Sequence, residues 1–433
     1  MINRRILAAL MAAVLCLTCL TGCQQQGGES SETQETETGF TPSLDKDTTQ
    51  TITVIGNYDN LEALEAAGAE FQKYYPNITV AYEKLDDYNT NMTPRLQEDS
   101  EVALFMISRY HFINNEALGD LITDVSEIGI DFDQINPSAY ESVYYNGKMY
   151  GIPIWFQYYG MVVNEDLFKA EGLEIPTNLS ELYECCEKLV TDGYVPLQQS
   201  SWMLRTFFLP WILRTAAKEM TNEELQAALA GEEGSCDKLA SVFETILDMI
   251  DKGYISRESM ASYEDYYNAA ILNFFEGDVP MMVATSETVT GMAKRETRSE
   301  AFQANPFGYH FVYSPIGETE PIVYKSMGVS FGLSSNCSYQ EVAQEFYRFL
   351  YTEDILNMMA DIKGAPSTAK NPSTELYGNL QEVSGNDLVV AGEFNDPTDK
   401  LQDVFGDTCD LISSGEVNSV EDALRMMEEL ARQ

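Results

Sequence analysis

The sequence predicts an α/β protein, because short apolar runs of strand length alternate along the chain with segments of helical periodicity. The first unit begins with an apolar run at residues 51–56 and continues with Leu61, Leu64 and Phe71 on one helical face. A second α/β set follows from residue 177. This alternation favours a twisted, mostly parallel sheet with helices on both faces.

The first set ends in a strand that is apolar throughout. Pro76 ends the first helix, the alternation over residues 78–82 predicts a second strand, and the continuous apolar run at residues 102–107 suits a central parallel strand. Ligands of such sheets bind beyond the carboxyl ends of the strands. We therefore expect the loops at residues 57–60 and 108–111 to form walls of a site.

The remaining elements follow from the same two periods and from turn residues. Asn146-Gly147 between β-prone residues is typical of a hairpin, and residues 155–164 continue as an extended segment. Further helices are predicted over residues 177–189 (ended by Gly193), 239–250 and 342–350 and up to Gly277, and further strands over residues 195–199, 279–284 and 327–333.

Composition narrows the classes of function. The length of 433 residues suffices for two or three domains, and 44% of the residues are hydrophobic. The chain has 69 acidic and 26 basic side chains, which give a formal charge of −43. This charge argues against nucleic acid and against docking on anionic lipid, but it leaves neutral solutes unhindered. The only histidines are His111 and His310, and no His, Cys or Asp grouping has metal-ligand spacing, so we expect no metal and no cofactor.

The N-terminus is typical of a bacterial export signal. Two arginines precede an uncharged, largely apolar run at residues 6–20, which ends in Leu20-Thr21-Gly22-Cys23 and resembles the lipobox of bacterial lipoproteins. In that pattern the cysteine is diacylated and becomes the mature N-terminus. We expect residues 1–22 to be a lipoprotein signal peptide, Cys23 to carry lipid and residues 23–50 to form a disordered tether. A plain secretory signal with an incidental cysteine is the alternative.

The cysteines of the body do not predict a disulfide framework. Five remain after residue 23, an odd number without the spacing of a redox or zinc motif. We expect free thiols at all five, which are Cys185, Cys186, Cys236, Cys337 and Cys409.

Four ordered stretches carry a family resemblance. Gly147-Lys-Met-Tyr-Gly-Ile-Pro153 leads into residues 159–168, and matching stretches follow at residues 176–182, 275–282 and 328–335. Together they resemble the signature of family 1 extracellular solute-binding proteins, the sugar receptors of ABC importers, of which maltose-binding protein is a relative. The sequence departs from the family pattern at Asn178, where tryptophan is usual, and at Ser286-Glu287, where a Gly-Trp pair is common.

The resemblance implies a two-lobed periplasmic-binding-protein-like fold, with hinge strands between lobes that close on a ligand. Lobe one is then expected at residues 51–157 and 287–331, and lobe two at residues 161–284 and 335–433. The implied function is binding of a neutral sugar or oligosaccharide between the lobes and its delivery to the permease subunits of an ABC importer. A non-enzymatic monomer, held by Cys23 on the outer face of the cytoplasmic membrane, is expected.

Candidate ligand contacts follow from the chemistry of sugars, whose apolar faces stack on flat aromatics and whose hydroxyl rims need polar partners. The expected crossing provides Trp155 and Tyr158 for stacking and Gln157 for a hydroxyl. Trp202 follows a predicted strand. The remaining candidates lie in lobe-one loops or near later junctions: Asn57, Tyr58, Arg109, Tyr110, Glu287 and Tyr324.

Other classes stay open at the level of the sequence. Adjacent tyrosines such as Tyr158-Tyr159 could chelate a ferric ion, and a peptide could replace the sugar. A secreted glycosidase needs two carboxylates about 5–10 Å apart, which a sequence does not reveal. A surface adhesin would need no hinge.

The Cys23→Ala variant tests the anchor. We expect it to block lipidation and to leave the precursor uncleaved by the lipoprotein peptidase, because the acylated cysteine is the recognised residue in the family pattern. Cell fractionation and the intact mass of the mature wild-type protein measure this. A mature N-terminus other than acylated Cys23 would contradict the expectation.

Overall fold

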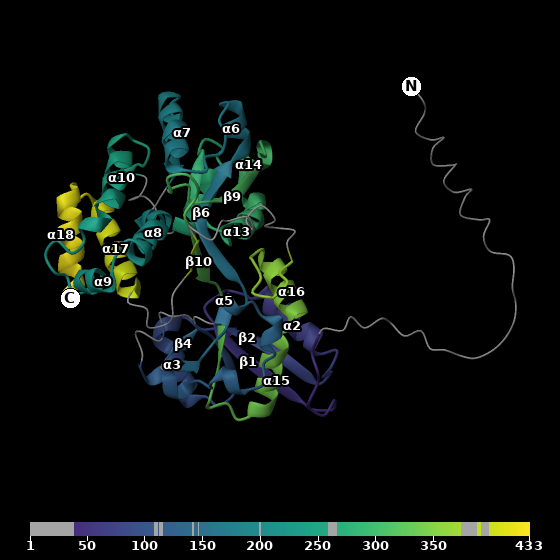
Figure 1. The fold of residues 1–433 in the computed structure, drawn as a ribbon. Helices are drawn as coiled ribbons and strands as arrows, with labels where there is room; N and C mark the ends of the chain where they lie inside the picture. The colour runs from purple at the N-terminus through teal and green to yellow at the C-terminus, as the bar shows by residue number, and fades with distance from the viewer. Residues whose placement is uncertain are drawn as a thin grey trace, which may run out of the picture. The chain divides into compact units, whose positions relative to one another are not determined.

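The computed structural model describes residues 39–107, 111, 116–140, 143–145, 147–198, 201–258, 266–373, 388–390 and 398–433. These residues form two sheets, each covered by helices (Figure 1). None of the helices in this part of the chain is long and apolar enough to cross a membrane.

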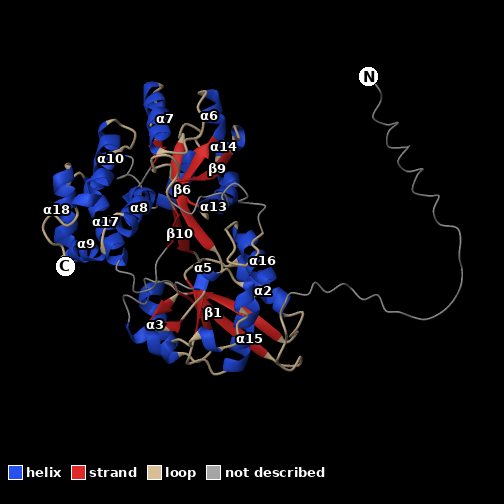
Figure 2. Cartoon of the chain, in the orientation of Figure 1, coloured by secondary structure: helices blue, strands red, loops and turns tan. Residues whose placement is uncertain are grey.

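The first sheet combines three parallel strands with one antiparallel strand. Its order is β11 (Ser330–Leu333), β3 (Val102–Ile107), β1 (Gln50–Gly56) and β2 (Ile78–Lys84), in which β11 runs antiparallel to β3. All six side chains of β3 are buried, as its uninterrupted apolar sequence predicts. The helices that accompany this sheet are α2 (Glu62–Phe71), α3 (Tyr88–Glu98), α15 (Gln340–Leu350) and α16 (Glu353–Lys363), and Figure 2 shows α2, α15 and α16 grouped beside the strands.

The second sheet is mixed rather than mostly parallel. Its path is β12 (Leu388–Val390), β10 (Val323–Met327), β6 (Phe156–Asn164), β8 (Met281–Thr285) and β7 (Leu197–Gln198), and β9 (Tyr309–Tyr313) also pairs with β6. Only the β7–β8 and β10–β12 pairs are parallel. The expectation of a mostly parallel sheet is therefore wrong for the second sheet, because β6 pairs in antiparallel orientation with its neighbours on both edges.

Helices make up most of the rest of the second half. They are α6 (Glu165–Ala170), α7 (Leu179–Thr191), α8 (Ser201–Lys218), α9 (Asn222–Leu229), α10 (Ala240–Asp251), α12 (Tyr266–Phe274), α13 (Thr288–Arg295), α14 (Glu300–Ala304), α17 (Thr398–Ser414) and α18 (Val420–Ala431). The short elements are α5 (Pro137–Tyr140), the hairpin of β4 (Tyr144–Tyr145) with β5 (Lys148–Met149), and 3₁₀ turns at Glu116–Leu121, Val125–Glu127, Phe132–Gln134, Asp237–Leu239 and Glu296–Arg298.

Helix α7 shows how local sequence sets an element. The Asn178 side chain accepts a hydrogen bond from the Glu181 N–H at 3.1 Å, so the residue that departs from the family pattern is a good N-cap. The chain leaves the helix at Gly193, whose φ of +94° favours glycine. The predicted helix over residues 177–189 is thus confirmed within two residues at each end.

Two hydrophobic cores define two lobes. We call lobe one the part whose buried side chains lie between residues 52 and 156 and between residues 329 and 369. Lobe two buries side chains between residues 161 and 324 and between residues 401 and 431. The chain crosses from one core to the other within β6 and returns between β10 and β11.

The predicted lobe boundaries are wrong between residues 287 and 369. Met292, Phe302 and Ile316 belong to the core of lobe two, because β9 and β10 pair with β6 there. Residues 335–369 belong to lobe one, where α15 and α16 pack against α2. The strand expected over residues 327–333 is confirmed as β11 from Ser330 onward, whereas Met327 ends β10, which lies in the other sheet.

Gly328 occupies the break between these two strands. Its N–H donates to the Trp155 carbonyl oxygen at 2.9 Å. A Cβ atom at this position would lie 2.3 Å from Cδ1 of the Trp155 ring and 2.7 Å from the Trp155 carbonyl oxygen. Only glycine allows the returning chain to pass so close to the tryptophan.

Within residues 39–50, Phe40, Ser43 and Leu44 contact lobe one, so the prediction of a tether that is disordered up to residue 50 is wrong for this part. The Phe40 ring meets the rings of Tyr74 and Phe349 edge-on at centroid distances of 5.2 and 5.1 Å. The segment therefore brings its own apolar anchor, which the composition of residues 24–50 as a whole concealed. We call residues 40–44 the N-terminal clasp.

A buried carboxylate holds the polar side of the clasp. Ser43 donates to Glu345 twice, from its N–H at 2.7 Å and from its Oγ at 2.6 Å. The Tyr75 hydroxyl and the Arg348 guanidinium donate to the same carboxylate. Burial pushes the pKa of Glu345 upward, but these donors outweigh it and the net pKa lies below 4.5. Burial and the Glu345 contact raise the pKa of Tyr75 to about 12.

The five cysteines of the body are buried and have free thiols. Burial raises the pKa of Cys185 and of Cys236 to about 11, which keeps both thiols protonated at neutral pH.

The clasp is tested by Phe40→Ala and Ser43→Ala, with the exposed Thr41→Ala as the control. We expect losses of about 2 and about 1 kcal/mol in the free energy of unfolding, from lost ring packing and from a lost charge-assisted hydrogen bond. Because the folded pKa of Glu345 is depressed, the Ser43 contribution is present above about pH 4.5 and fades as the pH falls below it. Denaturant unfolding at pH 7 and pH 3.5 measures both effects, and equal stability of all three variants would contradict the clasp.

Candidate functional site

A cavity with a volume of about 550 Å³ is lined from both lobes. One wall comes from the loop after β1 and from the end of α16, and the other from β8 and its surroundings. Strand β6, which runs between the two cores, contributes Gln157 to the lining. The first wall lies at the carboxyl end of a parallel strand, where the sequence places a site.

The lobe-one wall is polar and is held in place by β2. It consists of Asn57, Tyr58, Asp59 and Asn60 in the loop and of Lys363. The Tyr82 hydroxyl accepts from the Tyr58 N–H at 2.9 Å and donates to the Tyr58 carbonyl oxygen at 3.0 Å. Lys84 pairs with Asp59 at 2.7 Å and thereby lowers the pKa of that carboxyl group. The loop is thus tied at both its backbone and its charged side chain.

The lobe-two wall is largely apolar, with a polar edge. Its apolar residues come from α8, α12 and β8, and they are Met203, Ile271, Met282, Val283 and Ala284. The edge is formed by Thr285, Glu287 and Thr288 at the turn from β8 into α13. Gln157 reaches this edge, where its Nε2 donates to the Thr285 hydroxyl at 3.3 Å.

Glu287 joins the cavity to lobe one. Its Oε1 accepts a hydrogen bond from the Trp155 indole N–H at 2.7 Å, and its Oε2 lies 3.5 Å from the Lys363 Nζ. The Lys363 ammonium also lies 5.0 Å from the centre of the Tyr58 ring. A carboxylate from lobe two and a cation from lobe one therefore meet in the wall of the cavity.

Trp155 itself does not line the cavity. Its side chain is fully buried, with 0% exposure, in the core of lobe one. The predicted stacking role is therefore wrong, because a ring enclosed by core atoms and by Gly328 has no face to offer a sugar. Its contribution to the site is the indole N–H that orients Glu287.

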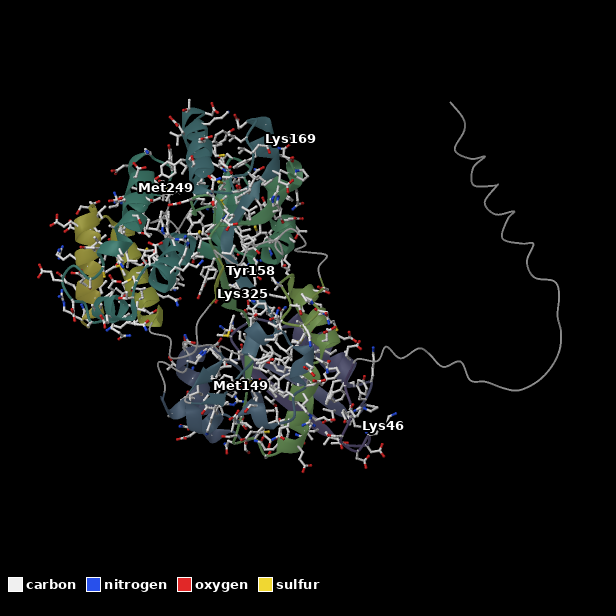
Figure 3. All side chains as sticks on the ribbon, viewed as in Figure 1. Lys46, Met149, Tyr158, Lys169, Met249 and Lys325 are labelled. Carbon is white, nitrogen blue, oxygen red and sulfur yellow. The ribbon has the colours of Figure 1, made fainter. Side chains whose placement is uncertain are left out.

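Tyr158 and Tyr324 also lie away from the cavity lining. Tyr158 packs edge-on against Tyr313 at 5.4 Å, and burial raises its pKa to about 12. Its register partner on β10 is Lys325, labelled beside it in Figure 3. Tyr324 is 3% exposed in the core of lobe two, where its ring meets the Tyr159 ring at 4.9 Å. These positions do not support the ligand contacts predicted for the two tyrosines. For Tyr158 the reason is that successive strand residues point to opposite faces, and its neighbour Gln157 lines the cavity.

Lys325 is a buried cation at the same junction. Its Nζ donates to the Ser138 hydroxyl at 2.7 Å and lies 3.7 Å from the centre of the Phe156 ring. Burial lowers the pKa of the Lys325 amine to about 8. Because Ser138 and Phe156 belong to lobe one and Lys325 to β10, these contacts connect the two lobes beside β6.

Four of the predicted residues come together in the cavity, namely Asn57, Tyr58, Gln157 and Glu287. Arg109, Tyr110 and Cys23 lie outside the described residues. Trp202 is in the first turn of α8, next to the cavity residue Met203, and its side chain is not among those described.

Sequence reasoning missed several lining residues. Asp59 and Asn60 belong to the predicted loop, and Thr285 lies between the expected lobe segments 161–284 and 287–331, so position could have indicated them. Met203 and Ile271 are apolar, and nothing in the sequence distinguishes them from ordinary core residues. Lys363 ends a helix that the periodicity analysis did not predict, and no motif surrounds it.

Two α/β lobes, linked by β6 and by a return at Gly328, with a cavity lined from both, define the class of two-lobed ligand-binding proteins. Residues 57–355 match the bacterial extracellular solute-binding protein family. The chain belongs to that family. No curated protein matches the chain.

Solved structures share the fold across nearly the whole chain. Apo RafE from Streptococcus pneumoniae has a TM-score of 0.70 at 17% identity, covering 90% of this chain and 99% of RafE. The ABC substrate-binding protein Lmo0181 from Listeria monocytogenes, in complex with cycloalternan, has a TM-score of 0.67 at 18% identity, covering 89% and 98%. The GacH receptor of Streptomyces glaucescens, known unliganded and with acarbose, has a TM-score of 0.67 at 15% identity, covering 88% and 97%.

The Trp155→Phe variant tests the role of the indole N–H. Phenylalanine keeps an aromatic ring in the core but removes the donor to Glu287, so we expect a loss of about 1–3 kcal/mol in the free energy of unfolding. Trp211→Phe is the control, because Trp211 is half-buried at the edge of the lobe-two core. Denaturant unfolding compares the two variants, and equal losses would contradict a special role for the Trp155–Glu287 bond.

Proposed function

We propose that this protein is a lipid-anchored receptor on the outer face of the cytoplasmic membrane. It binds a neutral sugar or oligosaccharide between its two lobes, leaves it chemically unchanged and delivers it to the permease subunits of an ABC importer. The proposal takes the protein to be a monomer attached through Cys23.

The observation that carries the proposal is the composition of the cavity. Polar side chains of lobe one face apolar residues of lobe two, which are almost fully buried, across a space of about 550 Å³, which lies within the range of small-molecule sites. A sugar ring has the same two characters, with hydroxyl groups at its rim and C–H groups on its faces. The Tyr58 ring supplies a flat aromatic surface, and Asn57, Asn60 and Gln157 supply amide groups for hydroxyls.

The charges of the cavity favour an uncharged ligand. Its carboxylates are those of Asp59, which is paired with Lys84, and Glu287, which lies beside Lys363. Each negative charge thus has a cation next to it, and the cavity presents little net charge. The body as a whole is strongly acidic and repels anions at long range, whereas a neutral sugar meets no such barrier.

Proteins with the same fold support the sugar class. RafE is known in complex with raffinose, Lmo0181 with cycloalternan and GacH with acarbose. The family supports an extracellular location. The clasp fastens residues 40–44 to lobe one, so a lipid on Cys23 would hold the receptor to the membrane through that lobe.

The ferric-ion alternative gains no support from the described tyrosines. In the Tyr158-Tyr159 pair, one ring packs against Tyr313 and the other against Tyr324. In the Tyr74-Tyr75 pair, the Tyr75 hydroxyl donates to Glu345. Adjacent rings that are directed to different partners do not form a chelating pair.

A thermal-shift screen against neutral mono- and oligosaccharides tests the proposal. A sugar that binds only the folded protein raises its melting temperature, by an amount that grows with concentration. We expect Tyr58→Ala to weaken the binding of the best saccharide about 5- to 150-fold, as for the loss of about 1–3 kcal/mol of ring contact. The control is Tyr144→Ala, an exposed tyrosine of the β4–β5 hairpin outside the cavity.

Two results would contradict the proposal. Recovery of the bound saccharide in a chemically altered form would make the protein an enzyme. Binding of peptides or metal ions, with no response to any saccharide of a broad panel, would leave the family in place but remove the carbohydrate.

A further inference from the structure

In the described part of the chain, two ion pairs lie between the lobes, and they differ in geometry and in surroundings. Lys294 of α13 pairs with Glu62 of α2 at 2.8 Å, and both side chains are about half exposed. Lys363 and Glu287 lie 3.5 Å apart, with side-chain exposures of 28% and 10%, in the wall of the cavity. The first pair is in direct hydrogen-bond contact, whereas the second is not.

Each member of the second pair is held by a different group. Trp155 fixes the Oε1 atom of Glu287, which leaves Oε2 directed toward Lys363. The Lys363 ammonium lies near the Tyr58 ring. An ammonium group has three donors, and an ionised carboxylate only accepts. The cavity wall therefore presents an acceptor and a donor a few ångströms apart, one from each lobe.

We propose that Glu287 and Lys363 together select uncharged sugars over acidic ones, an inference that rests on the proposed sugar-binding function. One hydroxyl of the sugar donates to Glu287, and a neighbouring hydroxyl accepts from Lys363. Two adjacent hydroxyls satisfy both groups, and contacting both at once bridges the two lobes.

The same pair works against a sugar that carries a carboxylate, such as a uronic acid. Lys363 alone would attract the carboxylate, but Glu287 repels it, and a carboxylate has no proton to donate to Glu287. Removing the charge of Glu287 should therefore admit acidic sugars. Removing the charge of Lys363 should weaken the binding of neutral ones without admitting acidic ones.

The competing explanation is that the pair only stabilises the fold. Such a pair would affect the unliganded protein most, and would resemble Lys294–Glu62 in its effect on the binding of sugars. The Lys294→Met variant is therefore a matched control, because it also removes a cation that spans the lobes but does not line the cavity.

The experiment uses isothermal titration of the protein with raffinose, maltotriose and cellotriose and with the uronic-acid form of each. Wild type, Glu287→Gln, Lys363→Met, Lys363→Arg and Lys294→Met are compared, with the unliganded melting temperature of each. Glutamine at position 287 keeps an oxygen that can accept from the Trp155 N–H, so the fold is preserved.

We expect Lys363→Met to weaken the binding of neutral sugars about 10-fold or more, with little change in the melting temperature of the unliganded protein. Lys363→Arg should restore most of the binding of neutral sugars, and Lys294→Met should leave that binding unchanged. Glu287→Gln should shift the preference toward the uronic acid about 10-fold or more. An unchanged preference in Glu287→Gln, or equal effects of Lys363→Met and Lys294→Met on binding, would overturn the inference. Failure of the wild type to bind any neutral saccharide would instead remove the proposed function on which the inference rests.

Discussion

The hydrogen bond between the Trp155 indole and Glu287 is the interaction on which the arrangement of the site depends. Trp155 lies in the core of lobe one just before β6, and Glu287 directly precedes α13 in lobe two. The same indole ring packs against Gly328, where the chain returns to lobe one. One buried side chain therefore contacts two of the connections between the lobes and orients the carboxylate of the cavity. Because a buried carboxylate that loses a donor is strongly destabilised, few substitutions at either position preserve this geometry.

The cavity needs both lobes because each supplies what the other lacks. Lobe one presents polar groups on a loop that Tyr82 and Lys84 hold from β2. Lobe two presents an apolar surface that continues its own core outward to the cavity. A ligand with hydroxyl rims and apolar faces gains full contact only where both surfaces meet, which is the physical basis for proposing a sugar as the ligand of this member of the solute-binding family.

Much of the fold could be predicted from the pattern of apolar residues along the sequence. The apolar run of β3 and the helical stripe of α10 are local signals, and the structure confirms the elements they predict. The N-cap role of Asn178 is seen only in the structure. Gly328 shows the limit, since a glycine that breaks one apparent strand into two is recognisable only when Trp155 is beside it. Asn57 and Tyr58 could be identified because they lie in the loop that directly follows β1. Lys363 could not be identified in this way, because it reaches the cavity through the packing of helices that are distant in sequence. The aromatic character of Trp155 led to the wrong prediction of a ligand contact, because large aromatic rings occur in buried cores as well as in binding sites.

The most direct test of the account is a crystal structure of the protein with the saccharide that gives the largest thermal shift. We predict that the sugar lies between the loop at residues 57–60 and the end of β8, with hydroxyl groups in hydrogen-bond contact with both Glu287 and Lys363. A sugar bound outside this cavity, or held by one lobe only, would contradict it.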